Sequence, residues 1–197
     1  MKFPGSIKDQ WDVALSCITI LGATVAFGIG LHQWRRGQAW QRADKLDDFI
    51  TKFESDDLLR LGATALDWSK RMTTYQGYQF LLLNDDALLA LRDHATITER
   101  PMFPGGQAQL RDAYDALLAF FQRLELSIAN GLIEADSTKA YFAYWLERLL
   151  KFDRHPDKNG VLKGVSPEAM VAGYIKLYGD PESIKRLCRC FKLKHNL

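Results

Sequence analysis

The sequence predicts an all-α protein in which one N-terminal transmembrane helix continues into a helical cytosolic bundle. Two observations carry this prediction. No charged side chain occurs in the 19 residues of Val13–Leu31. Beyond them, apolar residues recur at three- and four-residue steps, the period of one helix face, and the alternation typical of strands is almost absent. We therefore expect a short N-terminal segment at 1–12, a transmembrane helix at 13–34 and a helical cytosolic domain at 35–197.

The uncharged stretch Val13–Leu31 has the length of a membrane-spanning helix. At 1.5 Å per residue it extends about 28 Å, close to the ~30 Å hydrocarbon core of a bilayer. A cleaved secretory signal is the alternative interpretation. The stretch is longer than a typical signal core, however, and a basic segment follows it where a signal would have small residues for cleavage. The sequence therefore favours a retained anchor.

Residues on both sides of the stretch predict its orientation. The basic residues on its C-terminal side are Arg35, Arg36, Arg42 and Lys45, against Lys2 and Lys8 on its N-terminal side. By the positive-inside rule we expect the C-terminal domain in the cytoplasm, below a bacterial inner membrane. Tryptophan and arginine side chains favour the headgroup region. The predicted interface residues are Trp11, Trp34, Arg35, Arg36 and Trp40.

Small residues at four-residue steps predict self-association of the span. Gly22, Ala26 and Gly30 form a ridge, and such ridges let two transmembrane helix backbones approach closely. We therefore expect a homo-oligomer assembled through this ridge, with a ridge that merely faces lipid as the alternative. Ser16 and Thr19 lie near another side, where their hydroxyls could bond to a neighbouring helix.

Caps and breaks divide the rest of the chain into helices. We expect the first helix to run on from the span to Lys52, the next to run from a cap at Ser55 to about Arg71, and a loop to follow at Thr73–Tyr78. Further helices are expected at 84–94, with Asn84 as its cap, and at 107–129. The clearest break in the chain separates these two at 100–106. Three more helices should begin after the caps Asp136, Ser166 and Asp180. The predicted core face of 107–129 comprises Leu110, Tyr114, Leu117, Leu118, Phe121, Leu124 and Ile128.

The C-terminal segment combines a basic face with an apolar face. After Glu182 it contains no acidic residue and five basic ones: Lys185, Arg186, Arg189, Lys192 and Lys194. Ile184, Leu187 and Phe191 fall on a separate helix side. We expect this side to pack onto the domain, and binding to anionic lipid is the alternative.

Composition and motifs argue against several function classes. A net charge of +2 is too small for a general polyanion binder, so we do not expect nucleic acid as a partner. The sequence contains no nucleophile motif, no phosphate-binding glycine loop and no complete set of metal ligands, so we expect no metal and no cofactor. The turn at 153–166 puts His155 and Ser166 where a calcium loop needs carboxylates, and we interpret it as a polar turn.

One pattern supports a catalytic alternative. An arginine is followed a few residues later by a histidine twice, as Arg148 with His155 and as Arg189 with His195. This pattern resembles helical HEPN-type ribonucleases, in which such a pair near a helix end cleaves RNA. The resemblance implies that the histidine would act on the 2′-hydroxyl and the arginine on the phosphate. Leu149 and Cys190 follow the two arginines where that family keeps a polar residue, so we favour no catalytic residue.

The segment Tyr114–Phe152 (YDALLAFFQRLELSIANGLIEADSTKAYFAYWLERLLKF) resembles bacterial families with one N-terminal membrane helix and a small helical cytosolic domain. The layout also resembles the membrane-anchored, HEPN-like accessory proteins encoded beside some CRISPR effectors, which work as oligomers. These resemblances imply a self-associating effector or signalling protein without enzymatic chemistry of its own, with a role in antiviral defence. A membrane-tethered HEPN-like ribonuclease and a passive adaptor for a cytosolic protein partner are the alternatives.

Overall fold

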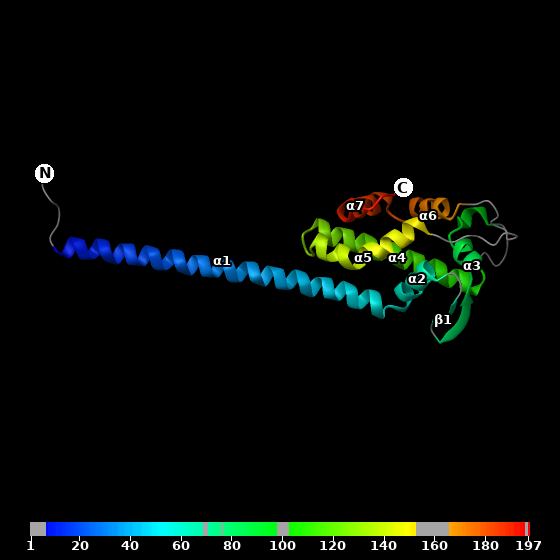
Figure 1. The fold of residues 1–197 in the computed structure, drawn as a ribbon, viewed down its shortest axis with the longest axis horizontal. Helices are drawn as coiled ribbons and strands as arrows, with labels where there is room; N and C mark the ends of the chain where they lie inside the picture. The colour runs from blue at the N-terminus through cyan, green and yellow to red at the C-terminus, as the bar shows by residue number, and fades with distance from the viewer. Residues whose placement is uncertain (1–6, 69–70, 76, 98–102, 153–165, 196) are drawn as a thin grey trace. The chain divides into compact units, whose positions relative to one another are not determined.

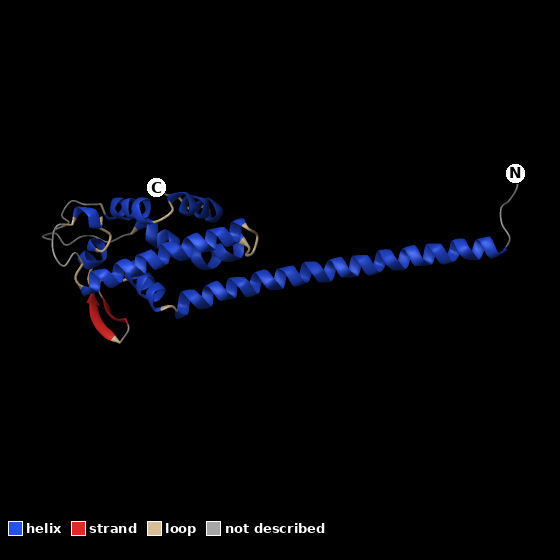
Figure 2. Ribbon diagram, turned by 180° about the vertical axis from the view of Figure 1, so that it is seen from behind, coloured by secondary structure: helices blue, strands red, loops and turns tan. Residues whose placement is uncertain are grey.

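The computed structural model describes residues 7–68, 71–75, 77–97, 103–152, 166–195 and 197. In this part of the chain the fold is helical apart from one small hairpin, so the predicted all-α class is confirmed (Figures 1 and 2). The chain divides into two compact units, Met1–Ala43 and Asp44–Leu197. The first unit is helical throughout its described residues, and the second contains the hydrophobic core.

The first helix, α1 (Ile7–Ser55), is 49 residues long. It includes both the predicted span and the segment 32–52, so the expectation of one uninterrupted helix is confirmed. No proline occurs within α1 to remove a backbone donor. No side chain of residues 15–31 is buried within the structure, and α1 is the one helix among the described residues that is long and apolar enough to cross a membrane.

The second unit is a bundle built around α4 (Gly105–Ala129), which packs against α2 (Asp57–Asp67), α3 (Asn84–Leu89) and α7 (Pro181–Phe191). The helix α5 (Ala135–Lys151) contacts α2, α7 and α6 (Pro167–Tyr178). The predicted face of α4 forms the centre of the core, with six residues buried and Ile128 at its margin. Gly62 on α2 permits close packing, because an added Cβ would lie 2.5 Å from Leu117 Cδ1 and 3.1 Å from the Ala113 carbonyl oxygen.

The helix caps agree only in part with those expected from the sequence. Ser166 and Asp180 cap α6 and α7 through their side chains, and a proline opens each helix, as expected. The cap of α2 is Asp56 and not Ser55, because the Asp56 carboxylate accepts from the Leu58 and Leu59 amides. This helix ends at Asp67, earlier than expected. Similarly, α5 begins one residue before the predicted cap Asp136, which lies in its first turn.

The segment expected to be a loop at Thr73–Tyr78 belongs to a hairpin. Strands β1 (Arg71–Tyr75) and β2 (Tyr78–Leu82) pair antiparallel, with Met72 opposite Leu81 (Figure 2). Gly77 adopts a φ of +81° in the turn, where a side chain would be strained. Each strand has five residues, too few for a clear alternation in the sequence, and its pairing depends on hydrogen bonds between strands.

The single helix expected at 84–94 is two elements. Helix α3 ends at Leu89, and a short 3₁₀ turn, η1 (His94–Thr96), follows it. Asp93 caps η1 by accepting from the Ala95 amide at 3.0 Å. Asn84 is not the cap of α3, because that position belongs to Leu83 and has no side-chain cap bond.

The C-terminal helix α7 packs onto the domain, as expected. Ile184, Leu187, Cys188 and Phe191 are fully buried on its inner side. Lys192 closes the helix in the left-handed conformation, with a φ of 57°. The basic side chains Arg186 and Arg189 remain exposed. The apolar face of α7 therefore packs onto the domain, which is the first of the two alternatives that the sequence left open.

Candidate functional site

The predicted association ridge is open in the structure. Gly22, Ala26 and Gly30 are exposed, and a Cβ added at either glycine would meet no atom within 4 Å. A 40° advance every four residues keeps the three on one side of the helix. The ridge therefore leaves room for a second helix to approach its backbone.

The hydroxyl groups of the span are satisfied within α1. Ser16 Oγ donates to the Asp12 carbonyl at 2.9 Å, and Thr19 and Thr24 make equivalent bonds of 2.8 Å to the carbonyls of Leu15 and Ile20. Bonds of this kind remove the cost of placing a hydroxyl donor in hydrocarbon. The hydroxyl hydrogens of Ser16 and Thr19 are therefore used within α1, and bonding of these groups to a neighbouring helix stays a prediction.

The predicted interface residues flank the span at suitable distances. Trp11, Trp34 and Trp40 are exposed, as are Arg35 and Arg36. Trp11 and Trp34 are separated by about 35 Å along the helix, between the ~30 Å hydrocarbon core and the ~40–45 Å of the whole bilayer. Both indole rings can therefore reach headgroup depth at opposite faces. Trp40, Arg35 and Arg36 lie beyond Trp34, on the C-terminal side of the predicted span.

Arg148, the first residue of the catalytic alternative, has a structural contact. Its Nη2 donates to the Leu66 carbonyl at 2.9 Å, and its Nε lies 3.7 Å from Asp67 Oδ1. This half-buried side chain joins α5 to the last carbonyls of α2, which lack partners within that helix. Its proposed companion His155 lies outside the described residues.

Arg189 and His195 lie on either side of the end of α7. Arg189 is exposed in the last turn of the helix, and His195 follows it as a half-buried residue. No hydrogen bond joins these two side chains in the described part of the chain. The sequence spacing therefore does not produce a directly bonded arginine–histidine pair at this position.

Metal ligation finds no support among the described residues, where no group of three or more His, Cys, Asp or Glu side chains could hold an ion. Cys188 is buried, and burial raises the pKa of its thiol to about 11. Cys190 is exposed. The two thiols therefore differ in environment, and Cys188 remains a protonated core residue at neutral pH.

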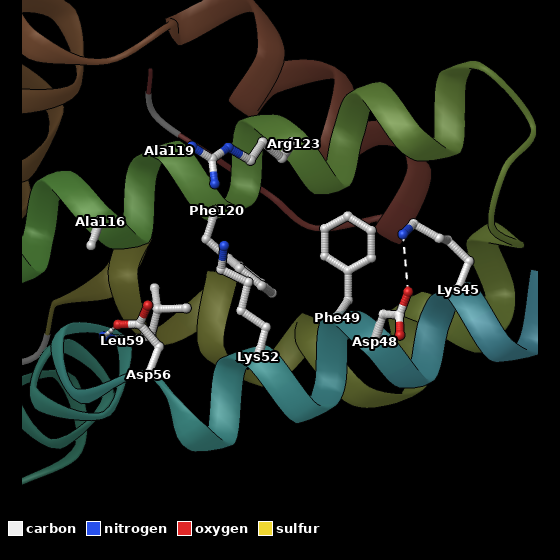
Figure 3. A pocket seen from close by; sticks show the side chains of 10 residues that line it. All are labelled: Lys45, Asp48, Phe49, Lys52, Asp56, Leu59, Ala116, Ala119, Phe120 and Arg123. Atoms are coloured by element: carbon white, nitrogen blue, oxygen red, sulfur yellow. Dashed lines mark hydrogen bonds and ion pairs between the residues drawn. The ribbon is translucent and has the colours of Figure 1, made fainter.

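An open groove lies on the second unit between α1 and α4 (Figure 3). Phe49 and Phe120 meet at its floor with ring centroids 5.8 Å apart, edge to face. The groove encloses about 300 Å³. Its lining residues are Lys45, Asp48, Phe49, Lys52, Asp56, Leu59, Ala116, Ala119, Phe120 and Arg123. The sequence interpretation did not identify this groove, although both helices show the periodicity of a contact stripe.

A second cluster missed from the sequence joins α6 to η1. The Tyr178 hydroxyl donates to Asp93 Oδ1 at 2.7 Å and accepts from the His94 backbone amide at 3.3 Å. Because its one hydrogen is used on Asp93, the 2.7 Å contact with His94 Nδ1 requires the imidazole hydrogen on Nδ1. The Tyr178 hydroxyl is the largest cause that lowers the pKa of Asp93. This cluster fastens two segments 85 residues apart.

Arg111 supports this cluster from α4. Its Nη1 donates to the carbonyls of Ala90 and Arg92 at 3.1 and 2.7 Å. Its guanidinium carbon lies 4.8, 5.0 and 4.4 Å from the ring centroids of Phe103, Tyr174 and Tyr178. Arg111 therefore stabilises the packing of three elements through cation–π contacts and carbonyl bonds.

A buried carboxylate links α4 and α7. Glu125 accepts from Arg186 Nε at 2.7 Å, from Arg186 Nη2 at 3.1 Å and from Ser183 Oγ at 3.0 Å. The Arg186 guanidinium is the main cause that lowers the pKa of Glu125. These three bonds satisfy a charge that would otherwise be costly to bury.

Comparison of the chain with protein-family models, with curated proteins and with solved structures finds no match.

Proposed function

We propose that this protein is a single-pass membrane protein that self-associates through its Gly22–Ala26–Gly30 ridge and acts as an effector or signalling protein of the bacterial inner membrane. The observation that carries the proposal is the apolar stretch of α1, of which residues 15–31 have no cover within the structure. Water is a poor environment for such a surface, and a bilayer covers it without further protein.

The charge distribution supports one orientation. Arg35 and Arg36 directly follow Trp34 at one end of the span, and Arg42 comes less than two turns later. Cytoplasmic loops carry such an excess of basic residues. The proposal therefore has the helical domain in the cytoplasm, where it receives a signal or a partner.

The orientation is tested by protease access in membrane vesicles of both sidedness. Protease on the cytoplasmic face should release the helical domain, while protease outside intact spheroplasts should leave it whole. Release from the outer face only would contradict the proposal. Recovery of the intact chain in the soluble fraction would remove the anchor altogether.

Self-association is tested with the double variant Gly22→Ile and Gly30→Ile. Bulky side chains on the ridge should separate the helix backbones and reduce the oligomer measured by light scattering in uncharged detergent. Gly28→Ile is the matched control, because Gly28 is equally open but lies on another side of α1. An unchanged mass distribution in the double variant would show that the ridge faces lipid.

A further inference from the structure

The groove between α1 and α4 is formed by two matching stripes. On α1, Lys45, Asp48, Phe49 and Lys52 occupy positions i, i+3, i+4 and i+7. On α4, the corresponding positions are Ala116, Ala119, Phe120 and Arg123. This spacing places the residues of each stripe on one helix face, the arrangement by which a helix contacts a neighbouring helix.

The shape of the groove suits a third helix. The stripe on α1, continued to Asp56, is about 16 Å long, or three helical turns. Because Ala116 and Ala119 have small side chains, a helix backbone can closely approach the α4 side of the groove. The half-buried ring of Phe49 offers apolar surface for a Leu or Phe side chain, and the buried ring of Phe120 supports it from the core. Amphipathic helices commonly dock into grooves of this kind.

The charges of the groove determine which helix fits. Asp48 is already paired with Lys45 at 3.0 Å, and the Asp56 carboxylate caps α2. Lys52 and Arg123 form no ion pair among the described residues. Figure 3 shows their side chains extending from opposite helices toward the space above Phe120. Two like charges repel each other there, and a carboxylate between them would be attracted to both.

We propose that this groove docks an amphipathic helix of a protein partner that carries acidic residues beside its apolar stripe. The apolar residues of the partner would cover Phe49, Ala116 and Ala119, while its carboxylates would pair with Lys52 and Arg123. This interaction lies within the second unit and does not depend on the association ridge. It adds a partner of defined chemistry to the proposed function.

A synthetic peptide pair tests the proposal with the full chain in uncharged detergent micelles. The probe is a fluorescein-labelled helix of about four turns with Leu at i, i+3, i+4 and i+7 and Glu beside them. Its twin carries Lys in place of every Glu. Fluorescence anisotropy should show binding of the acidic peptide and at least about tenfold weaker binding of the basic peptide.

Two variants localise the interaction. The double variant Lys52→Glu and Arg123→Glu should weaken binding of the acidic peptide at least about tenfold and strengthen binding of the basic one. Lys176→Glu with Arg189→Glu changes the net charge equally on exposed parts of α6 and α7 and should leave both affinities unchanged. Ala119→Trp fills the groove without a charge change and should also abolish binding. Thermal unfolding confirms that each variant is folded.

Several results would overturn the proposal. Equal affinity for the two peptides would contradict the charge argument, and unchanged binding by the folded Lys52→Glu and Arg123→Glu variant would move the interaction elsewhere. If phosphatidylglycerol vesicles bind through Lys52 and Arg123 and the acidic peptide does not displace them, the groove takes lipid. Loss of the chain's own oligomer in this variant, without peptide binding in the wild type, would identify a second copy as the occupant.

Discussion

The two units of the chain place apolar side chains in opposite environments. Phe27 in the first unit is 73% exposed, whereas Phe121 on α4 is fully buried. Both belong to regular helices, so secondary structure does not explain the difference. The second unit buries its hydrophobic core with its own helices, whereas the apolar side chains of residues 15–31 have no cover within the structure. This contrast teaches that the stability of the two units must be measured against different surroundings.

Hydrogen bonding shows the same contrast. The hydroxyls of Ser16, Thr19 and Thr24 bond four residues back along α1. In the second unit, Tyr178 reaches Asp93 across 85 residues, and Arg186 reaches Glu125 across 61. The first unit therefore satisfies these polar groups locally, whereas the second depends on tertiary contacts. Matched substitutions in the two units can sharpen or break this comparison.

The largest difference is expected for phenylalanine truncation. Phe121→Ala should lower the free energy of unfolding of the second unit by about 3–5 kcal/mol, because it leaves a cavity in the core. Phe27→Ala should leave that free energy unchanged. Guanidinium titration of the full chain in uncharged micelles, followed by near-UV circular dichroism, measures both. A comparable loss in the two variants would break the comparison.

Glycine substitution should give a smaller difference. Gly62→Ala introduces a Cβ close to Leu117 and Ala113 and should cost about 1–3 kcal/mol, a decrease of several degrees in Tm. Gly22→Ala meets no atom within 4 Å and should not change the Tm of the second unit. An equal Tm for Gly62→Ala and the wild type would mean that α2 and α4 can move apart without loss of stability.

Arg186→Ala should destabilise the second unit at neutral pH by less than the two preceding core substitutions, since it leaves the buried Glu125 carboxylate without its cation and Arg186 itself is half exposed. The folded-state pKa of Glu125 lies below the ordinary 4.5, so its contribution is present above pH 4.5 and is lost as pH falls through the lowered pKa. The stability gap between wild type and variant should therefore close in acid.

Lys185→Ala is the control for that measurement, because Lys185 pairs with the exposed Glu182 on the same helix at 2.8 Å. This surface pair should contribute little. A gap for Arg186→Ala that persists unchanged at low pH would show that packing, and not the Glu125 charge, causes the loss.

The smallest effect is expected for Tyr178→Phe. The Tyr178 hydroxyl holds the pKa of Asp93 below its ordinary 3.8, so the variant should raise the midpoint of the Asp93 titration measured by NMR. Its stabilising effect is present above pH 3.8 and disappears as pH falls through the lowered pKa. Tyr141→Phe, which removes a bond to Glu54, should leave Asp93 unaffected. An unchanged Asp93 midpoint in Tyr178→Phe would contradict the assigned cause.

Features that depend on neighbouring residues could be predicted from the sequence. Ser166 caps α6 through a bond to an amide three residues away, and Asp180 does the same for α7. The core face of α4 follows from the helical period alone. The candidate membrane span Val13–Leu31 likewise needed no tertiary information, because it was identified from its length and its lack of charge.

Features that join distant residues could not be predicted in this way. The cap of α2 moved from Ser55 to Asp56, because backbone geometry at the end of α1 decides which oxygen reaches the free amides. The hairpin depends on bonds between strands. Arg148 was named with His155 only in the catalytic alternative, and its bond to the Leu66 carbonyl of α2 could not be predicted from that spacing.

By itself the sequence determined the helical class, the candidate membrane span and the amphipathic faces, since each follows from composition and period along one segment. Only the tertiary structure decided which faces meet. It brought the stripe of Phe49 and Lys52 opposite that of Phe120 and Arg123, and left a groove between them. The physical reason is that a contact between helices depends on their relative position, which no single segment encodes.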